Sequence, residues 1–308
     1  MFGDYVFEKT AAQYTKKMML VDADHLEEKV HYSAVFQAHG FRTFAYTDDL
    51  NFRVNNTSLL NGEGKLAILV QPGVYVPYDI RKKCREEEIS FESLFPKLNS
   101  AVLRESKNLD LELLTLAYQT DFEEYHERKQ TEMFFRRKMY SQKNVEYYLR
   151  DLYECALSQA KSVEDYRAWF EIAEKKATID VTAVEHNVDI DTSELNRAFC
   201  AYAMKNFGKL SSEINLESPV MVSSVMDYIH DHSEKAAIIV MDGMSEFDWT
   251  ILKRSFAGIC YRQSAAFAMI PSTTSISRQC LLSGKYPSQL IEPVSYTHLR
   301  AHETPEHL

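Results

Sequence analysis

Polar residues that could take part in phosphoryl transfer follow two apolar runs near the end of the chain. Residues 236–241 lead directly into Asp242, and residues 265–270 lead into a Pro-Ser-Thr-Thr stretch that ends at Thr274. A carboxylate at such a position is a hard oxygen ligand that suits a divalent metal ion. A hydroxyl at the start of a helix can serve as a nucleophile, because the backbone N–H groups there favour its alkoxide form. These residues could instead have a purely structural role, since Asp-Gly is a common turn and Thr is a common N-cap residue.

The elements expected to position these residues are two strands of a parallel sheet. Each apolar run is short and ends at a turn signal, which is typical of a buried parallel strand. The carboxyl ends of such strands form the edge at which open α/β sheets build their sites. We therefore expect residues 216–292 to begin a domain with a parallel sheet, after a short helix over 220–230.

The first part of the chain, residues 1–79, predicts a small α/β unit. Two apolar runs, at 18–21 and 65–70, and a strand-like stretch at 41–46 predict three strands. A helical pattern covers residues 25–39, and we expect Asp22 or Asp24 to cap this helix. The alternative is the acidic pocket of a response-regulator receiver. We reject it because the third strand ends in Gln71-Pro72 and not in an acceptor Asp.

Residues 80–215 differ in character and predict a helical domain. Glycine almost disappears there, and apolar residues recur at helical spacing. The basic cluster Arg136-Arg137-Lys138 could contact a phosphate backbone, but glutamates lie nearby in the sequence and we expect a solvated helix face. The turn-rich stretch 211–219 marks the next boundary. The fold class expected for the whole chain is α/β.

Composition narrows the class of protein. The 308 residues are 45% hydrophobic and 26% charged, which is ordinary for a globular protein. The formal net charge of −10 argues against binding nucleic acid through overall charge, although a local basic groove stays open. The 5 cysteines show no metal-finger spacing, and no apolar segment reaches the roughly 20 residues of a membrane span. We expect a cytoplasmic protein with no membrane partner.

Three motifs together resemble the start of a PglZ domain, which belongs to the alkaline phosphatase superfamily. They are Val240-Met241-Asp242-Gly243-Met244, Ile270-Pro271-Ser272-Thr273-Thr274 and Leu281-Leu282-Ser283-Gly284-Lys285-Tyr286-Pro287. By this resemblance Asp242 is a metal ligand and Thr274 the metal-bound nucleophile. Thr273 is the alternative nucleophile, because adjacent threonines leave the register open. The family implies two metal ions, usually zinc, with manganese or magnesium as alternatives.

The resemblance implies a metal-dependent phosphohydrolase or phosphodiesterase, with diesters favoured over monoesters. The phosphate-ester substrate could be a nucleic acid or a nucleotide. PglZ proteins are associated with bacterial BREX-type phage defence, which implies other defence-system subunits as partners. The main alternative is a non-catalytic scaffold subunit with a degenerate phosphatase fold, and a transferase or mutase that shares the nucleophile is a third.

The chain departs from the family after Pro287. The family would place further Asp and His ligands downstream, but residues 293–308 resemble a translated sequencing adapter, since VSYTHLRAHE is one frame of a transposase adapter. We exclude this stretch from the fold, including its histidines. The chain is therefore expected to be an N-terminal fragment of a longer enzyme. It should be poorly soluble and inactive by itself, because its sheet would keep an unpaired edge and two ligands cannot hold two metal ions.

Overall fold

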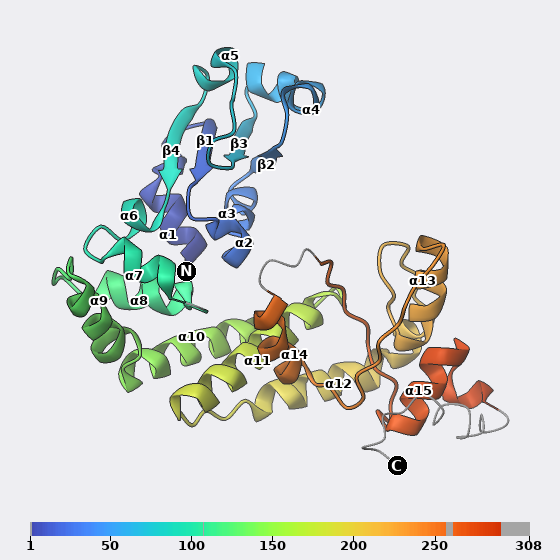
Figure 1. The fold of residues 1–308 in the computed structure, drawn as a ribbon. Helices are drawn as coiled ribbons and strands as arrows, with labels where there is room; N and C mark the ends of the chain where they lie inside the picture. The colour runs from blue at the N-terminus through green and yellow to red at the C-terminus, as the bar shows by residue number, and fades with distance from the viewer. Residues whose placement is uncertain (1, 107, 257–260, 291–308) are drawn as a thin grey trace. The chain divides into compact units, whose positions relative to one another are not determined.

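In a computed structural model of the chain, residues 2–106, 108–256 and 261–290 are described (Figure 1). They form two compact units, of which the first ends at Tyr148 and the second begins at Leu149. The division falls inside a long helix, α10 (Gln142–Lys161). The adapter-like stretch lies outside the described residues.

A four-stranded parallel sheet forms the centre of the first unit (Figure 1). Its strands lie in the order β2-β3-β1-β4, with bounds Lys17–Asp22 (β1), Phe41–Tyr46 (β2), Lys65–Val70 (β3) and Arg85–Ile89 (β4). The first three strands are the ones that the sequence predicts. The prediction succeeds for the central strand β1 because a buried strand needs apolar side chains, and Met18 and Leu20 are fully buried. The α/β fold is confirmed at this level.

Strand β4 has no signal in the sequence, because its five residues, Arg-Glu-Glu-Glu-Ile, are mostly charged. It is an edge strand that pairs in parallel with β1, where Asp22 lies opposite Ile89. An edge strand tolerates charged side chains, since one of its sides faces solvent. The sheet therefore extends past residue 79 into the stretch for which the sequence predicts helices.

The rest of the first unit consists mainly of short helices. They are α1 (Phe2–Lys9), α2 (Leu26–Val30), α3 (Ser33–Ala38), α4 (Asp49–Asn61), α5 (Tyr78–Arg81), α6 (Phe91–Leu94), α7 (Ser100–Glu105), α8 (Leu111–Thr120) and α9 (Arg128–Phe134). The single helix predicted over 25–39 is interrupted, because His31 adopts a left-handed conformation with φ 41° between α2 and α3. Helix α4 covers part of the sheet, with Phe52 and Leu60 in the same core as Ile68.

The second unit is helical in the described residues. After α10 it contains α11 (Ala168–His186), α12 (Ser193–Leu210), α13 (Val225–His232), α14 (Glu246–Leu252) and α15 (Thr274–Ser283). Its core joins residues from distant parts of the sequence, including Trp169, Leu195, Met221, Phe267 and Cys280.

The two strands predicted for the second unit are not formed within the described residues. Residues 236–241 have no regular structure and are exposed, with Ile239 90% accessible to solvent. Residues 265–270 make only one parallel bridge, in which the Val222 N–H donates to the Phe267 carbonyl at 2.9 Å. The strands are absent from this part of the structure because a strand needs a hydrogen-bonded neighbour along its length. The described part of the chain supplies none for either run.

Candidate functional site

Two of the predicted site residues meet in the second unit. The Thr274 hydroxyl lies close enough to the Asp242 carboxylate to lower its pKa, although the two residues belong to separate motifs. Thr274 is the first residue of α15, and Asp242 lies in the turn that follows the exposed run 236–241. Both residues are exposed, so a ligand could approach them from solvent.

Arg278 joins this pair and is not among the site residues predicted from the sequence. Its Nη2 donates to Asp242 Oδ2 at 2.7 Å. Arg278 follows Thr274 by one helical turn, and residues at this spacing share a helix face. Both can therefore reach the same carboxylate. A basic residue four positions after the expected nucleophile is the signal in the sequence that could have revealed it.

The Arg278 hydrogen bond holds the pKa of Asp242 below its ordinary value. Partial burial acts in the opposite direction and raises the pKa, whereas the Arg278 charge, the Thr274 hydroxyl and the Gly243 N–H lower it further. Asp242 therefore stays ionised at neutral pH. A carboxylate with a low pKa is a weak base, so its chemistry favours the binding of a cation over proton abstraction.

Thr274 is positioned by the anchoring of α15. Cys280 is fully buried in the core of the second unit, and Ile276 packs against the same core. The helix ends at Gly284, whose φ of 68° is readily adopted by glycine and whose N–H donates to the Cys280 carbonyl at 3.1 Å. The Tyr286 hydroxyl then donates to the Ser211 carbonyl at 2.6 Å. The third motif of the sequence thus holds α15 in place.

Asp242 is positioned by a tight turn and by the helix that follows it. Gly243 has a φ of 68°, a conformation that glycine adopts at little steric cost. Helix α14 then begins with a capping box at Ser245 and packs on α11. Lys253, directly after α14, forms an ion pair with Glu174 of α11 at 2.7 Å.

Thr273, the alternative nucleophile, is the N-cap residue of α15. Its side chain makes no capping hydrogen bond, and its carbonyl accepts from the Ser277 N–H at 2.9 Å. In the described part of the chain, the threonine that contacts Asp242 is Thr274. The geometry therefore distinguishes two neighbours that the sequence leaves equivalent.

The donor atoms of Asp242 and Thr274 fit part of a metal site. A carboxylate and a hydroxyl are both hard oxygen ligands, which suit magnesium and manganese and are also found with zinc. Within residues 2–106, 108–256 and 261–290, no group of three or more His, Cys, Asp or Glu side chains is arranged to hold a metal ion. The described residues thus offer two ligands, and a complete coordination shell needs further ones.

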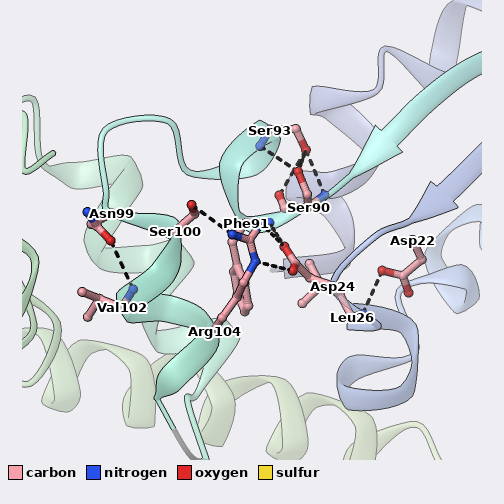
Figure 2. Close-up of polar contacts among 10 residues, drawn as sticks. All are labelled: Asp22, Asp24, Leu26, Ser90, Phe91, Ser93, Asn99, Ser100, Val102 and Arg104. Carbon is pink, nitrogen blue, oxygen red and sulfur yellow. Dashed lines mark hydrogen bonds and ion pairs between the residues drawn. The ribbon is translucent and has the colours of Figure 1, made fainter. Parts of the chain in front are cut away.

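A second group of carboxylates lies in the first unit, where the sequence suggests a helix cap (Figure 2). Asp22 accepts a hydrogen bond from the Leu26 N–H at 2.8 Å, which confirms that it caps α2. Asp24 accepts from the Phe91 N–H and from Arg104 Nε, both at 2.7 Å. These bonds give both carboxylates a structural role.

The basic cluster of the first unit is exposed, as predicted. Arg136, Arg137 and Lys138 all face solvent in the π-helical turn Phe135–Met139. Lys138 forms an ion pair with Asp121 at 2.9 Å.

Comparisons of the chain with known proteins find no match. No protein-family model, no curated protein and no solved structure matches it. The resemblance to PglZ domains therefore rests on the three motifs of the sequence. Among the helices of the described residues, none combines the length and the apolar character needed to cross a bilayer.

Proposed function

We propose that this chain carries part of the active site of a metal-dependent phosphohydrolase, a phosphodiesterase of the PglZ type. The observation that carries the proposal is the proximity of Thr274 and Asp242, which are close enough for the Thr274 hydroxyl to lower the pKa of the Asp242 carboxyl. These are the two residues that the resemblance assigns as nucleophile and metal ligand, and they come from separate motifs. Their contact is what a shared site requires.

In the proposed reaction the Thr274 oxygen attacks the phosphorus of a phosphate ester and the bond to the leaving oxygen breaks. The N–H groups in the first turn of α15 favour negative charge at this oxygen. Asp242 and Thr274 would hold a divalent ion, zinc with manganese or magnesium as alternatives, which stabilises negative charge on the reacting oxygens. In a second displacement, water attacks the phosphorus and breaks its bond to the Thr274 oxygen, which releases a phosphate monoester when the substrate is a diester.

The proposal includes the architecture around the site. Residues 236–241 and 265–270 would be the first strands of an alkaline-phosphatase-like sheet, preceded by a helical domain and the N-terminal α/β unit. Their composition supports this, because both runs are apolar throughout, as in strands that are covered on both faces. Neighbouring strands and the remaining ligands would lie outside the described residues.

The resemblance also supports a cellular setting. A PglZ-type enzyme would act in the bacterial cytoplasm within a BREX-type defence system, together with other subunits of that system. Its substrate would be a phosphate ester, with a nucleic acid or a nucleotide as candidates.

Substitution of the two threonines tests the proposed nucleophile. The experiment uses the protein translated from the uninterrupted reading frame, with zinc and bis(4-nitrophenyl) phosphate as substrate. We expect Thr274→Ala to reduce kcat at least about a thousandfold, because the covalent step loses its nucleophile. Bound zinc, measured by elemental analysis, should largely remain.

Thr273→Ala is the matched control and should retain most of the activity. Loss of activity in Thr273→Ala alone would move the nucleophile to Thr273. Full activity in both variants would refute a threonine nucleophile.

The ion pair between Arg278 and Asp242 favours a second candidate function. It gives Asp242 a structural partner that needs no metal, as expected of a scaffold subunit that keeps the phosphatase fold without its chemistry. A wild-type protein that binds no zinc and hydrolyses no diester would support the scaffold.

A further inference from the structure

Arg278 forms an ion pair with Asp242, the carboxylate that the proposed function assigns as a metal ligand. Its Nη2 lies 2.7 Å from Asp242 Oδ2. The guanidinium cannot lose its charge in a protein, so the pair persists at any pH at which Asp242 is ionised. A guanidinium and a divalent cation both seek the lone pairs of the same carboxylate oxygens. The guanidinium and the metal ion therefore cannot both bind the same oxygen atoms of Asp242.

We propose that Arg278 and the metal ion compete for Asp242. In the metal-free protein Arg278 pairs with the carboxylate, and it moves away from Asp242 when the metal ion binds. This inference rests on the proposed role of Asp242 as a ligand. Arg278 is a positioning residue in this scheme, since it acts on the metal through Asp242. It shares a face of α15 with Thr274, so the displaced guanidinium stays close to the nucleophile.

The solvent exposure of the ion pair determines how strongly Arg278 can weaken metal binding. The side chains of Asp242 and Arg278 are 45% and 26% exposed, so water screens their attraction. Ion pairs of this kind are weak, and removing the competitor should tighten metal binding by about two- to tenfold. A metal ion that binds several ligands can break so weak an ion pair, and the ion pair can form again when the metal ion leaves.

Zinc titration of the metal-free protein by calorimetry measures the competition directly. The protein is the product of the uninterrupted reading frame, and Asp242→Asn defines the binding that does not involve this site. We expect Arg278→Gln to bind zinc about two- to tenfold more tightly than the wild type. Arg278→Lys should stay close to the wild type, because it keeps the positive charge.

Arg254→Gln is the matched control, since Arg254 forms an ion pair with Glu185 elsewhere in the same unit. It should leave zinc affinity unchanged. Unchanged or weaker binding in Arg278→Gln, or equal tightening in Arg278→Lys, would overturn the competition while Asp242 remains a ligand. Zinc affinity that is unchanged in Asp242→Asn would instead refute the ligand role and with it the proposed metal site.

Discussion

Asp24 and Asp242 each bind an arginine, but burial gives the two ion pairs different consequences. The side chain of Asp24 is 8% exposed, whereas that of Asp242 is 45% exposed. A buried carboxylate that loses its partner is costly, while an exposed one is rehydrated at little cost. The pair of Asp24 and Arg104 therefore stabilises the fold. The exposed pair of Asp242 and Arg278 contributes little to stability.

Arg104→Gln tests the structural pair. Burial raises the pKa of Asp24, but the hydrogen bonds from Arg104 and the Phe91 N–H and the charges of Arg104 and Lys29 lower it below its ordinary value. A lowered pKa in the folded state adds stability above the unfolded pKa, and that stability disappears as the pH falls through the folded pKa. We expect Arg104→Gln to reduce the free energy of unfolding by about 1–3 kcal/mol at pH 7, measured by urea titration.

The difference between the wild type and Arg104→Gln should shrink as the pH falls from about 4 through the lowered pKa of Asp24, because the carboxylate that Arg104 stabilises is then lost. Arg128→Gln is the control, since Arg128 and its partner Glu105 are both more than half exposed. It should change the stability very little. A loss in Arg104→Gln that does not depend on pH would contradict the assignment.

Helix α4 shows how a weakly amphipathic sequence becomes a helix. Asp48 caps it by accepting from the Asn51 N–H at 2.8 Å. Phe52, Asn56 and Leu60 follow at intervals of one turn and are buried. Asn56 is fully buried, and neither of its amide atoms has a hydrogen-bond partner in the described structure. An unpaired buried amide destabilises the fold, since it gives up its hydrogen bonds to water.

Asn56→Leu should therefore stabilise the first unit. We expect the free energy of unfolding to rise by about 1–2 kcal/mol, because the apolar side chain removes the desolvation cost of the amide. Urea unfolding monitored by circular dichroism measures the change. Asn55→Leu, on the exposed side of the same helix, should change the stability by less than about 0.5 kcal/mol. Destabilisation by Asn56→Leu would show that the amide has a partner, such as a buried water.

The chain as a whole exposes an extended apolar run. Ile238, Val240 and Met241 are 44%, 52% and 54% exposed, and Ile239 is 90% exposed. An extended apolar segment without hydrogen-bonded neighbours is a template for pairing with another chain. Residues 236–241 should therefore drive self-association of the 308-residue chain.

Ile239→Lys should reduce this self-association. Sedimentation velocity over a range of protein concentrations should show a concentration-dependent increase in mass for the wild type and a smaller increase for the variant. The charge opposes pairing because it would be buried between chains. Ile214→Lys is the control, since Ile214 is 85% exposed but lies outside the run. Equal effects of both substitutions would show that added charge, and not this run, controls association.

The sequence alone determined the features that depend on local pattern. The apolar runs of β1 and β3 are correctly predicted because the centre of a parallel sheet accepts little else. Strand β2 lies at an edge of the sheet, where its mixed composition is tolerated. The capping role of Asp22 is confirmed because N-cap chemistry is local. The same holds for the exposed cluster at Arg136, where nearby acidic residues indicate a solvated helix face.

Tertiary structure decided what depends on distant neighbours. Strand β4 forms although it is charged, because β1 offers it an edge, whereas the apolar run 236–241 stays irregular because no described segment pairs with it. The contact of Asp242 with Thr274 and Arg278 likewise arises only when α15 is anchored in the core of its unit. Hydrogen-bond partners and burial belong to pairs of segments, and a pattern within one segment does not specify them.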